Sequence, residues 1–120
     1  MLQMNSLILE GTVAENCKVL EPKAGFLVGR FPIRVDRFYK NKNGENVGES
    51  SYFDIETYGL MTEKLSSKIV KGRGIRVIGR LKQETYKDGE NRSHSRVYVV
   101  AEYIEFKVFK QEVENVCNKN

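Results

Sequence analysis

The sequence has no tryptophan, one histidine, two cysteines and two prolines. Cys17 and Cys117 lie 100 residues apart, which fits neither a zinc knuckle nor a CxxC redox pair, so we predict no metal site and no cofactor. The single histidine, His94, has no cysteine near it to complete a pair of nucleophile and base. Neither of the glycine motifs that bind phosphates, GxxxxGK[ST] or GxGxxG, is present. We therefore assign no catalytic residue and do not expect an enzyme.

Long apolar runs are also missing. None approaches the ~20 residues that a membrane-spanning helix needs, and no signal-like leader opens the chain. We therefore expect a cytoplasmic protein that does not bind membranes. In a reducing cytoplasm cysteines stay free, and Cys17 lies in an apolar stretch, so it is expected to be a small buried side chain.

The 120 residues suffice for one domain, which we assign to residues 1–107, followed by a short extension, residues 108–120. The net charge of +4 is unevenly spread: residues 1–60 hold 7 basic and 8 acidic residues, and residues 61–107 hold 11 and 6. A basic stripe in the second half commonly faces a polyanion, although a solvated sheet face is an equally good explanation of charge alone. The stripe consists of Lys71, Arg73, Arg76, Arg80 and Lys82.

Alternation of apolar and polar residues predicts five β-strands. They cover residues 6–13, 26–39, 51–58, 75–86 and 95–107. Apolar residues spaced by four predict a short helix within residues 60–70. The polar, glycine-containing segment 40–50 predicts a long hairpin loop, and Asp88-Gly89 predicts a tight turn.

The order of these elements predicts the fold. Three strands, a short helix and two more strands are the order of an all-β, five-stranded Greek-key OB-fold (oligonucleotide-binding) barrel, with the helix between strands 3 and 4. In the third strand, alternation predicts that Phe53 and Ile55 face the core while Tyr52, Glu56 and Tyr58 face solvent.

Four tyrosines fall at strand ends or on outward faces, with the basic fourth strand among them: Tyr39, Tyr52, Tyr58 and Tyr86. A protein that binds single-stranded nucleic acid without sequence preference needs rings on which bases stack and cations that meet phosphates. The alternative is that the tyrosines cover the barrel as cross-strand pairs with their hydroxyls outward. The four together favour stacking.

Five segments, in order, resemble the bacterial single-stranded DNA-binding protein family over about residues 4–107. They are MNSLILEGTVAEN, RFPIRVDRFYK, YFDIETYG, LMTEKLSSKIVKG and IRVIGRLKQETYKDGENRSHSRVYVVAEYIEF. The resemblance implies sequence-nonspecific binding and protection of ssDNA in replication, recombination and repair, in the cytoplasm at the nucleoid. It also implies a homotetramer, or at least a dimer of barrels. The candidate nucleic-acid-binding residues are Tyr39, Tyr52, Tyr58, Tyr86, Arg34, Phe38, Lys71, Arg73, Arg76, Arg80 and Lys82.

The sequence departs from that family in three ways. Every stacking position is tyrosine where the family often has tryptophan, and Glu56 and Glu84 stand near the binding face, so we expect weaker binding. The chain ends QEVENVCNKN, without the family's linker and acidic tip, so we do not expect recruitment of replication enzymes through a tail. A primosomal replication-restart accessory of the same fold, and an RNA-binding or protein-interaction OB module, are the alternatives.

Overall fold

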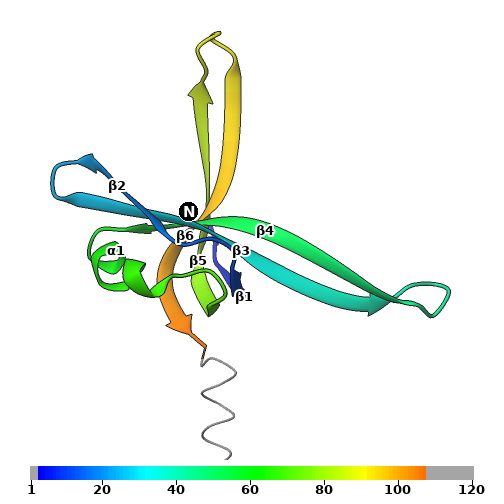
Figure 1. Cartoon of the computed structure of the whole chain (residues 1–120). Coiled ribbons are helices and arrows are strands. Elements are labelled where there is room, and N and C mark those ends of the chain that lie inside the picture. Colours follow the sequence, from blue (N-terminus) through cyan, green and yellow to red (C-terminus); the bar gives the residue numbers. More distant parts are fainter. Residues whose placement is uncertain (1–2, 108–120) are drawn as a thin grey trace, which may run out of the picture.

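The computed structural model describes residues 3–107, which form six strands, one α-helix and one 3-10 helix (Figure 1). In chain order they are β1 (Leu7–Val13), β2 (Lys18–Lys23), β3 (Phe26–Lys40), β4 (Asn46–Tyr58), α1 (Leu60–Leu65), the 3-10 helix η1 (Ser66–Lys68), β5 (Gly74–Lys87) and β6 (Ser93–Phe106). The predicted extension, residues 108–120, lies outside the described residues.

Five of the strands close into a barrel. Its order is β1-β5-β6-β4-β3, and β3 returns to pair with β1 through Thr12 and Val13. All neighbours are antiparallel except β4 and β6, which run parallel and pair at Ile55 with Val99 and at Glu56 with Val100. The predicted five-stranded barrel, with its helix between the third and fourth barrel strands, is confirmed.

The core of the barrel comes from the inward side of the alternation. Ile33, Ile55, Ile75 and Val77 are completely buried. β5 and β6 approach so closely at Gly79 that a Cβ added there would overlap the carbonyl oxygen of Val100. Only glycine fits this position, because a side chain needs space that the neighbouring backbone already fills.

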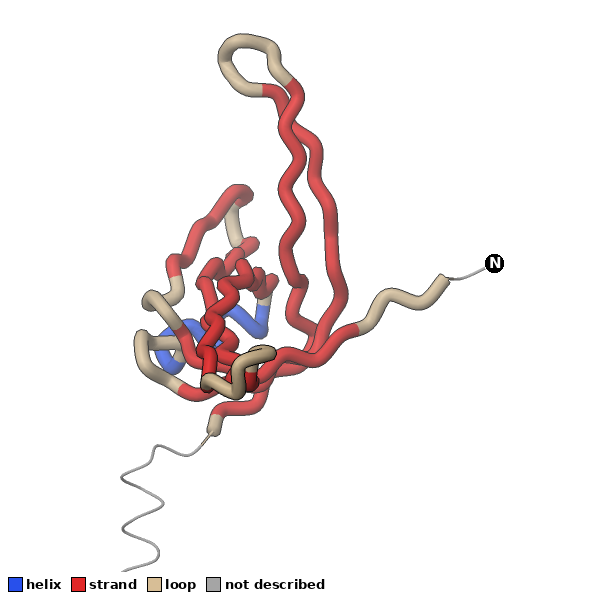
Figure 2. Tube along the Cα trace, turned by 90° about the vertical axis from the view of Figure 1, so that its right-hand side faces the viewer, coloured by secondary structure: helices blue, strands red, loops and turns tan. Residues whose placement is uncertain are grey.

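Two pairs of strands continue past the barrel as two-stranded arms (Figure 1), and Figure 2 shows the arm of β5 and β6 rising from the barrel. The β3–β4 arm pairs as far as Lys40 with Asn46, and the β5–β6 arm as far as Lys87 with Ser93. The prediction of a long loop over residues 40–50 was therefore wrong. Most of that segment is strand, and the connection is a short turn in which Gly44 takes a positive φ of 77°.

Other expectations from the sequence also need correction. The strand β2, which pairs with the first part of β3, was not predicted, and all six of its residues are exposed. Phe53 has the inward parity but is 37% exposed, because it lies where the barrel opens into the arm. Glu56 was expected to face solvent and is only 2% exposed. Cys17 is half-buried against the core, and burial raises the pKa of its thiol.

Candidate nucleic-acid interface

The outer face of the β3–β4 ladder carries most of the candidate side chains. In order along the ladder, the register sets Val28 opposite Tyr58, Arg30 opposite Glu56, Pro32 opposite Asp54, and Arg34 opposite Tyr52. Because side chains alternate between the two faces of a strand, these residues form one surface, with a tyrosine at each end and charged side chains between them. We refer to this surface as the β3–β4 outer face.

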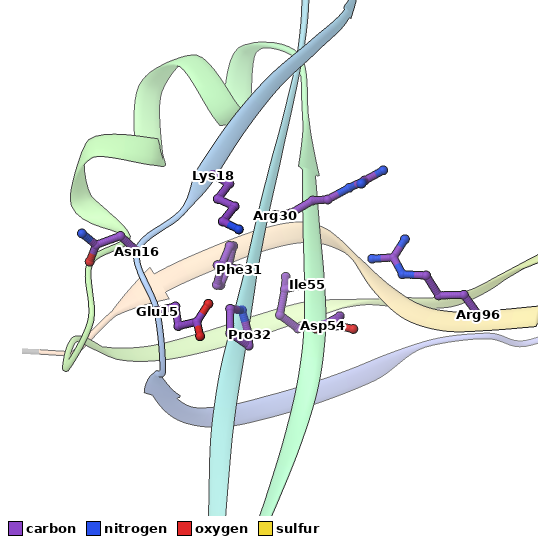
Figure 3. A pocket seen from close by; sticks show the side chains of 9 residues that line it. All are labelled: Glu15, Asn16, Lys18, Arg30, Phe31, Pro32, Asp54, Ile55 and Arg96. Carbon is purple, nitrogen blue, oxygen red and sulfur yellow. The ribbon is translucent and has the colours of Figure 1, made fainter.

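Three hollows follow one another along the β3–β4 outer face. The first, of about 200 Å³, is lined by Pro32 of β3, with Lys18 and Glu15 on one side of it and Arg30 and Arg96 on the other (Figure 3). Its complete lining is Glu15, Asn16, Lys18, Arg30, Phe31, Pro32, Asp54, Ile55 and Arg96.

The second and third hollows lie on either side of the first. The second shares Glu15 and Pro32 with it and is also lined by Arg34, Tyr52 and Lys71. The third shares Arg30 and is also lined by Phe26, Tyr58, Lys82 and Glu84. Neighbouring hollows therefore adjoin one another across the barrel, with a tyrosine in the hollow at each end, and we refer to the three together as the track.

The four candidate tyrosines differ in how open their rings are. Tyr52 is 64% exposed and Tyr86 is 52% exposed, although the Tyr86 ring stacks on His94 with centroids 5.4 Å apart. Tyr58 is half-buried, and its ring lies parallel to that of Phe26, 6.1 Å away. Burial, together with hydrogen bonds to Tyr98 and Glu56, raises the pKa of Tyr58 well above its ordinary value, so its hydroxyl stays protonated.

Tyr39 occupies a different side of the ladder. It pairs with Val47, so it has the parity opposite to that of Tyr52, and the guanidinium of Arg37 lies 5.5 Å from its ring centroid. Phe38 is the aromatic residue of the outer arm that shares the face of Arg34 and Tyr52. Phe38 is also largely exposed, and its ring packs beside Gly48 on the opposite strand.

The structure separates the basic stripe into two groups. Lys71 and Lys82 line the second and third hollows, and neither forms an ion pair within residues 3–107. Arg76 instead donates to Glu10 at 2.7 Å and to Glu105 at 3.2 Å. Arg80 lies 3.9 Å from Glu102, and Arg73 packs over the ring of Phe106. Only the two lysines of the stripe thus belong to the track.

Three basic residues of the track were missing from the candidates: Lys18, Arg30 and Arg96. Arg30 and Arg96 both contact the buried Glu56, whose Oε1 accepts from Arg30 Nε at 2.7 Å and from Arg96 Nη1 at 3.2 Å. Of these three residues, only Arg30 could have been predicted from the sequence, because the alternation in its strand places it on the outward face. The other two could not be found from spacing, since they come from β2 and β6.

Glu56 is the centre of a polar network on this face. Besides the two arginines it accepts from the Tyr58 hydroxyl, at 2.7 Å. Burial alone would raise the pKa of Glu56, but the hydrogen bonds from Tyr58 and Arg96 and the charge of Arg30 hold it below its ordinary value. On the next two strands, the Tyr98 hydroxyl donates to Glu84 at 2.9 Å, and the Arg96 guanidinium lies over the Tyr98 ring. Glu56 is therefore ionised and fully partnered.

Other kinds of site find no support within the described part of the chain. Among residues 3–107, no group of three or more His, Cys, Asp and Glu side chains is arranged to hold a metal ion. No helix in that range is long and apolar enough to cross a membrane. We therefore take the track on the barrel as the candidate ligand-binding surface.

The sequence matches the model of the Single-strand binding protein family over residues 4–116. The chain belongs to this family. It is 33% identical over 101 residues to the single-stranded DNA-binding protein of Aquifex aeolicus, a match that covers 84% of this chain and 68% of the relative. It is 30% identical over 110 residues to single-stranded DNA-binding protein 1 of Clostridium acetobutylicum, covering 91% of this chain and 98% of the relative.

Solved structures of single-stranded DNA-binding proteins share this fold. The Plasmodium falciparum protein, solved in complex with ssDNA, superposes with a TM-score of 0.80 at 19% identity, over 90% of this chain and 98% of that one. The wild-type Thermus aquaticus protein superposes with a TM-score of 0.76 at 24% identity, over 90% of this chain and 52% of that one. The OB-fold predicted from the sequence is confirmed.

The match to the single-strand binding protein family includes every candidate residue of the interface. It also extends past the predicted end of the domain at residue 107. That boundary stays a prediction.

Proposed function

We propose that this protein binds single-stranded DNA without sequence preference and protects it during replication, recombination and repair. The track of three adjoining hollows on the β3–β4 outer face is the observation that carries the proposal. The names of its relatives and the ssDNA complex of the Plasmodium falciparum protein support it. Neither a catalytic step nor a cofactor is part of this proposal.

The mechanism combines stacking with charge. Unpaired bases stack on Tyr52 and Tyr58 at the two ends of the track and on Tyr86 of the β5–β6 arm, since every base offers a flat aromatic face. Phosphates meet the cations between them, above all Lys18, Lys71 and Lys82. Arg34, which lines the second hollow and pairs with the exposed Asp36 at 3.2 Å, adds another cation. Stacking and charge do not depend on which base is present, so binding tolerates any sequence.

Binding to labelled dT, U and duplex oligonucleotides at several salt concentrations tests this function. We expect dT to bind more tightly than duplex DNA, because paired bases cannot stack on the tyrosines. With three or four phosphates contacted, log K should fall against log salt with a slope of roughly −2 to −3, at about 0.7 per contact. Equal binding of duplex and dT would contradict the proposal, and tighter binding of U would favour the RNA-binding alternative.

We also propose that the barrels associate, as a homotetramer or at least a dimer. Ile8 is 65% exposed on the outer face of β1, opposite Ile78 of β5, which in turn pairs with the exposed Tyr103 of β6. β1 pairs with β3 only at Thr12 and Val13, so its other edge from Leu7 to Glu10 meets no strand of the described chain. An apolar patch beside an unpaired edge favours contact with another copy.

Light scattering at micromolar concentration tests this association. We expect a mass of about four times the 13.8 kDa of one chain. Ile8→Asp should lower that mass, because a carboxylate would be buried in the contact. Val19→Asp is the matched control on the exposed strand β2 and should leave the mass unchanged. A parent mass of 13.8 kDa would contradict the proposal.

A further inference from the structure

The three groups around Glu56 have the chemistry of an anion-binding site. Two guanidinium groups and one hydroxyl donate to its carboxylate, at 2.7, 3.2 and 2.7 Å. Arginine and hydroxyl donors of this kind are also what a phosphate group binds in proteins. In this chain the place of the anion is taken by the protein's own side chain.

The two arginines nevertheless remain within reach of a ligand. The Arg30 side chain is 47% exposed and that of Arg96 is 28% exposed, whereas that of Glu56 is 3% exposed. Both arginines line the first hollow, and Arg30 also lines the third (Figure 3). A phosphate of bound ssDNA on the track would therefore meet the outer side of both guanidinium groups while Glu56 holds their inner side.

The charges around this point determine how strongly the arginines attract a phosphate. Lys18 of β2 is directly opposite Arg30, and like charges opposite each other on a sheet are unfavourable unless an anion offsets them. Glu56 supplies that anion. Glu84 is the other acid facing Arg96, but it lies 3.9 Å away and accepts a hydrogen bond from Tyr98. Glu56 is thus the main counter-charge of both arginines.

We propose that Glu56 is an internal counter-ion that competes with the phosphates of ssDNA for Arg30 and Arg96, and so limits the strength and the salt dependence of binding. This inference rests on the proposed ssDNA binding. It assigns a role to Glu56, Arg30 and Arg96, which take no part in the stacking of bases on tyrosines.

The test is Glu56→Gln, which keeps the size of the side chain and an acceptor oxygen for Tyr58 but removes the charge. Two freed arginines should add up to two phosphate contacts, so the salt slope should steepen by about 0.7 to 1.4. We expect at least threefold tighter binding to dT at low salt. Asp54→Asn is the matched control, because it removes one carboxylate from the same face of the same strand. It should raise affinity less than Glu56→Gln and leave the slope unchanged.

A double-mutant cycle separates this role from a structural one. Arg30→Gln should cost little in the parent, where Glu56 already holds Arg30, but should remove about half of the added slope in the Glu56→Gln background. If Glu56 only holds the strands together, Glu56→Gln will lower the melting temperature, and its salt slope will equal that of the parent. That outcome would overturn the inference.

The arginine variant also tests the inference if Glu56→Gln does not fold. In the parent, Arg30→Gln should change the salt slope by less than Lys82→Gln, since Lys82 has no ion-pair partner within residues 3–107. An equal loss of slope in the two variants would mean that Arg30 contacts phosphate freely. Failure of the parent to bind dT would instead contradict the proposed function, so the two failures are distinct.

Discussion

Replacing Tyr52 and Tyr86 together by alanine is expected to weaken binding to poly-dT by about thirtyfold or more. Each base–aromatic stack contributes roughly 1–3 kcal/mol, so the loss of two stacks costs at least about 2 kcal/mol, which is about thirtyfold in the dissociation constant. These two tyrosines suit the test because both are more than half exposed, and removing their rings leaves no cavity in the core. Titration with fluorescently labelled dT measures the change.

The matched control keeps the rings. Tyr52→Phe with Tyr86→Phe removes only the hydroxyls, so this variant should bind poly-dT nearly as well as the parent. Circular dichroism melting curves of both variants show whether the barrel is intact. If the folded alanine variant binds like the parent, the two tyrosines do not stack on bases. Tyr58 is less suited to this test, because its hydroxyl donates to Glu56 and its replacement would disturb both arginines.

Replacing Gly79 by alanine is expected to have the largest effect on stability. The added Cβ would overlap the backbone carbonyl of Val100, and a backbone atom in a closed barrel cannot move aside without shifting its strand. Overpacking of a core typically costs 1–3 kcal/mol, and a clash with backbone lies at or above the top of that range, so we expect about 3 kcal/mol or more. The midpoint of urea unfolding measures this loss.

Gly89→Ala provides the comparison. Gly89 lies in the turn of the β5–β6 arm, and nothing lies within 4 Å of a Cβ added there. Its replacement should change the free energy of unfolding by less than about 0.5 kcal/mol. Similar unfolding midpoints for the two variants would show that the barrel can accommodate a side chain where β5 and β6 approach each other, and would contradict this prediction.

The alternation of side chains was sufficient to predict the barrel and the β5–β6 arm, but not the outer part of β4 or the strand β2. Within the barrel one face of each strand is buried. The apolar–polar alternation that includes Ile33, Ile55 and Val77 is therefore sufficient to predict their strands. In β2 and in the outer part of β4 both faces are largely exposed, and the apolar–polar alternation is lost. These strands are specified by backbone pairing to a neighbour, as Lys40 pairs with Asn46 across the turn at Gly44.

The candidate site was predicted in part for a similar reason. The outward tyrosines Tyr52 and Tyr58 could be read from one strand. The burial of Glu56 depends on Arg30 and Arg96, which lie 26 and 40 residues away in the sequence. The pairing of Arg76 of the basic stripe could not be predicted either, because the acids that accept from it come from β1 and β6 and are distant from it in sequence. Partners brought by different strands are not visible in local spacing.

The pairing of β1 with β5 has a consequence for synthesis on the ribosome. Leu7 pairs with Gly79, so β1 emerges long before β5, the strand with which it forms most of its pairs. Until β5 is made, β1 can pair only with β3, and only through Thr12 and Val13. The edge of β4 that pairs with β6 is also unpaired during this time. Unpaired strand edges on a nascent chain are open to pairing with neighbouring chains. The barrel must therefore close after translation of the described region is almost complete, and the interval before closure is when this chain is most exposed to aggregation.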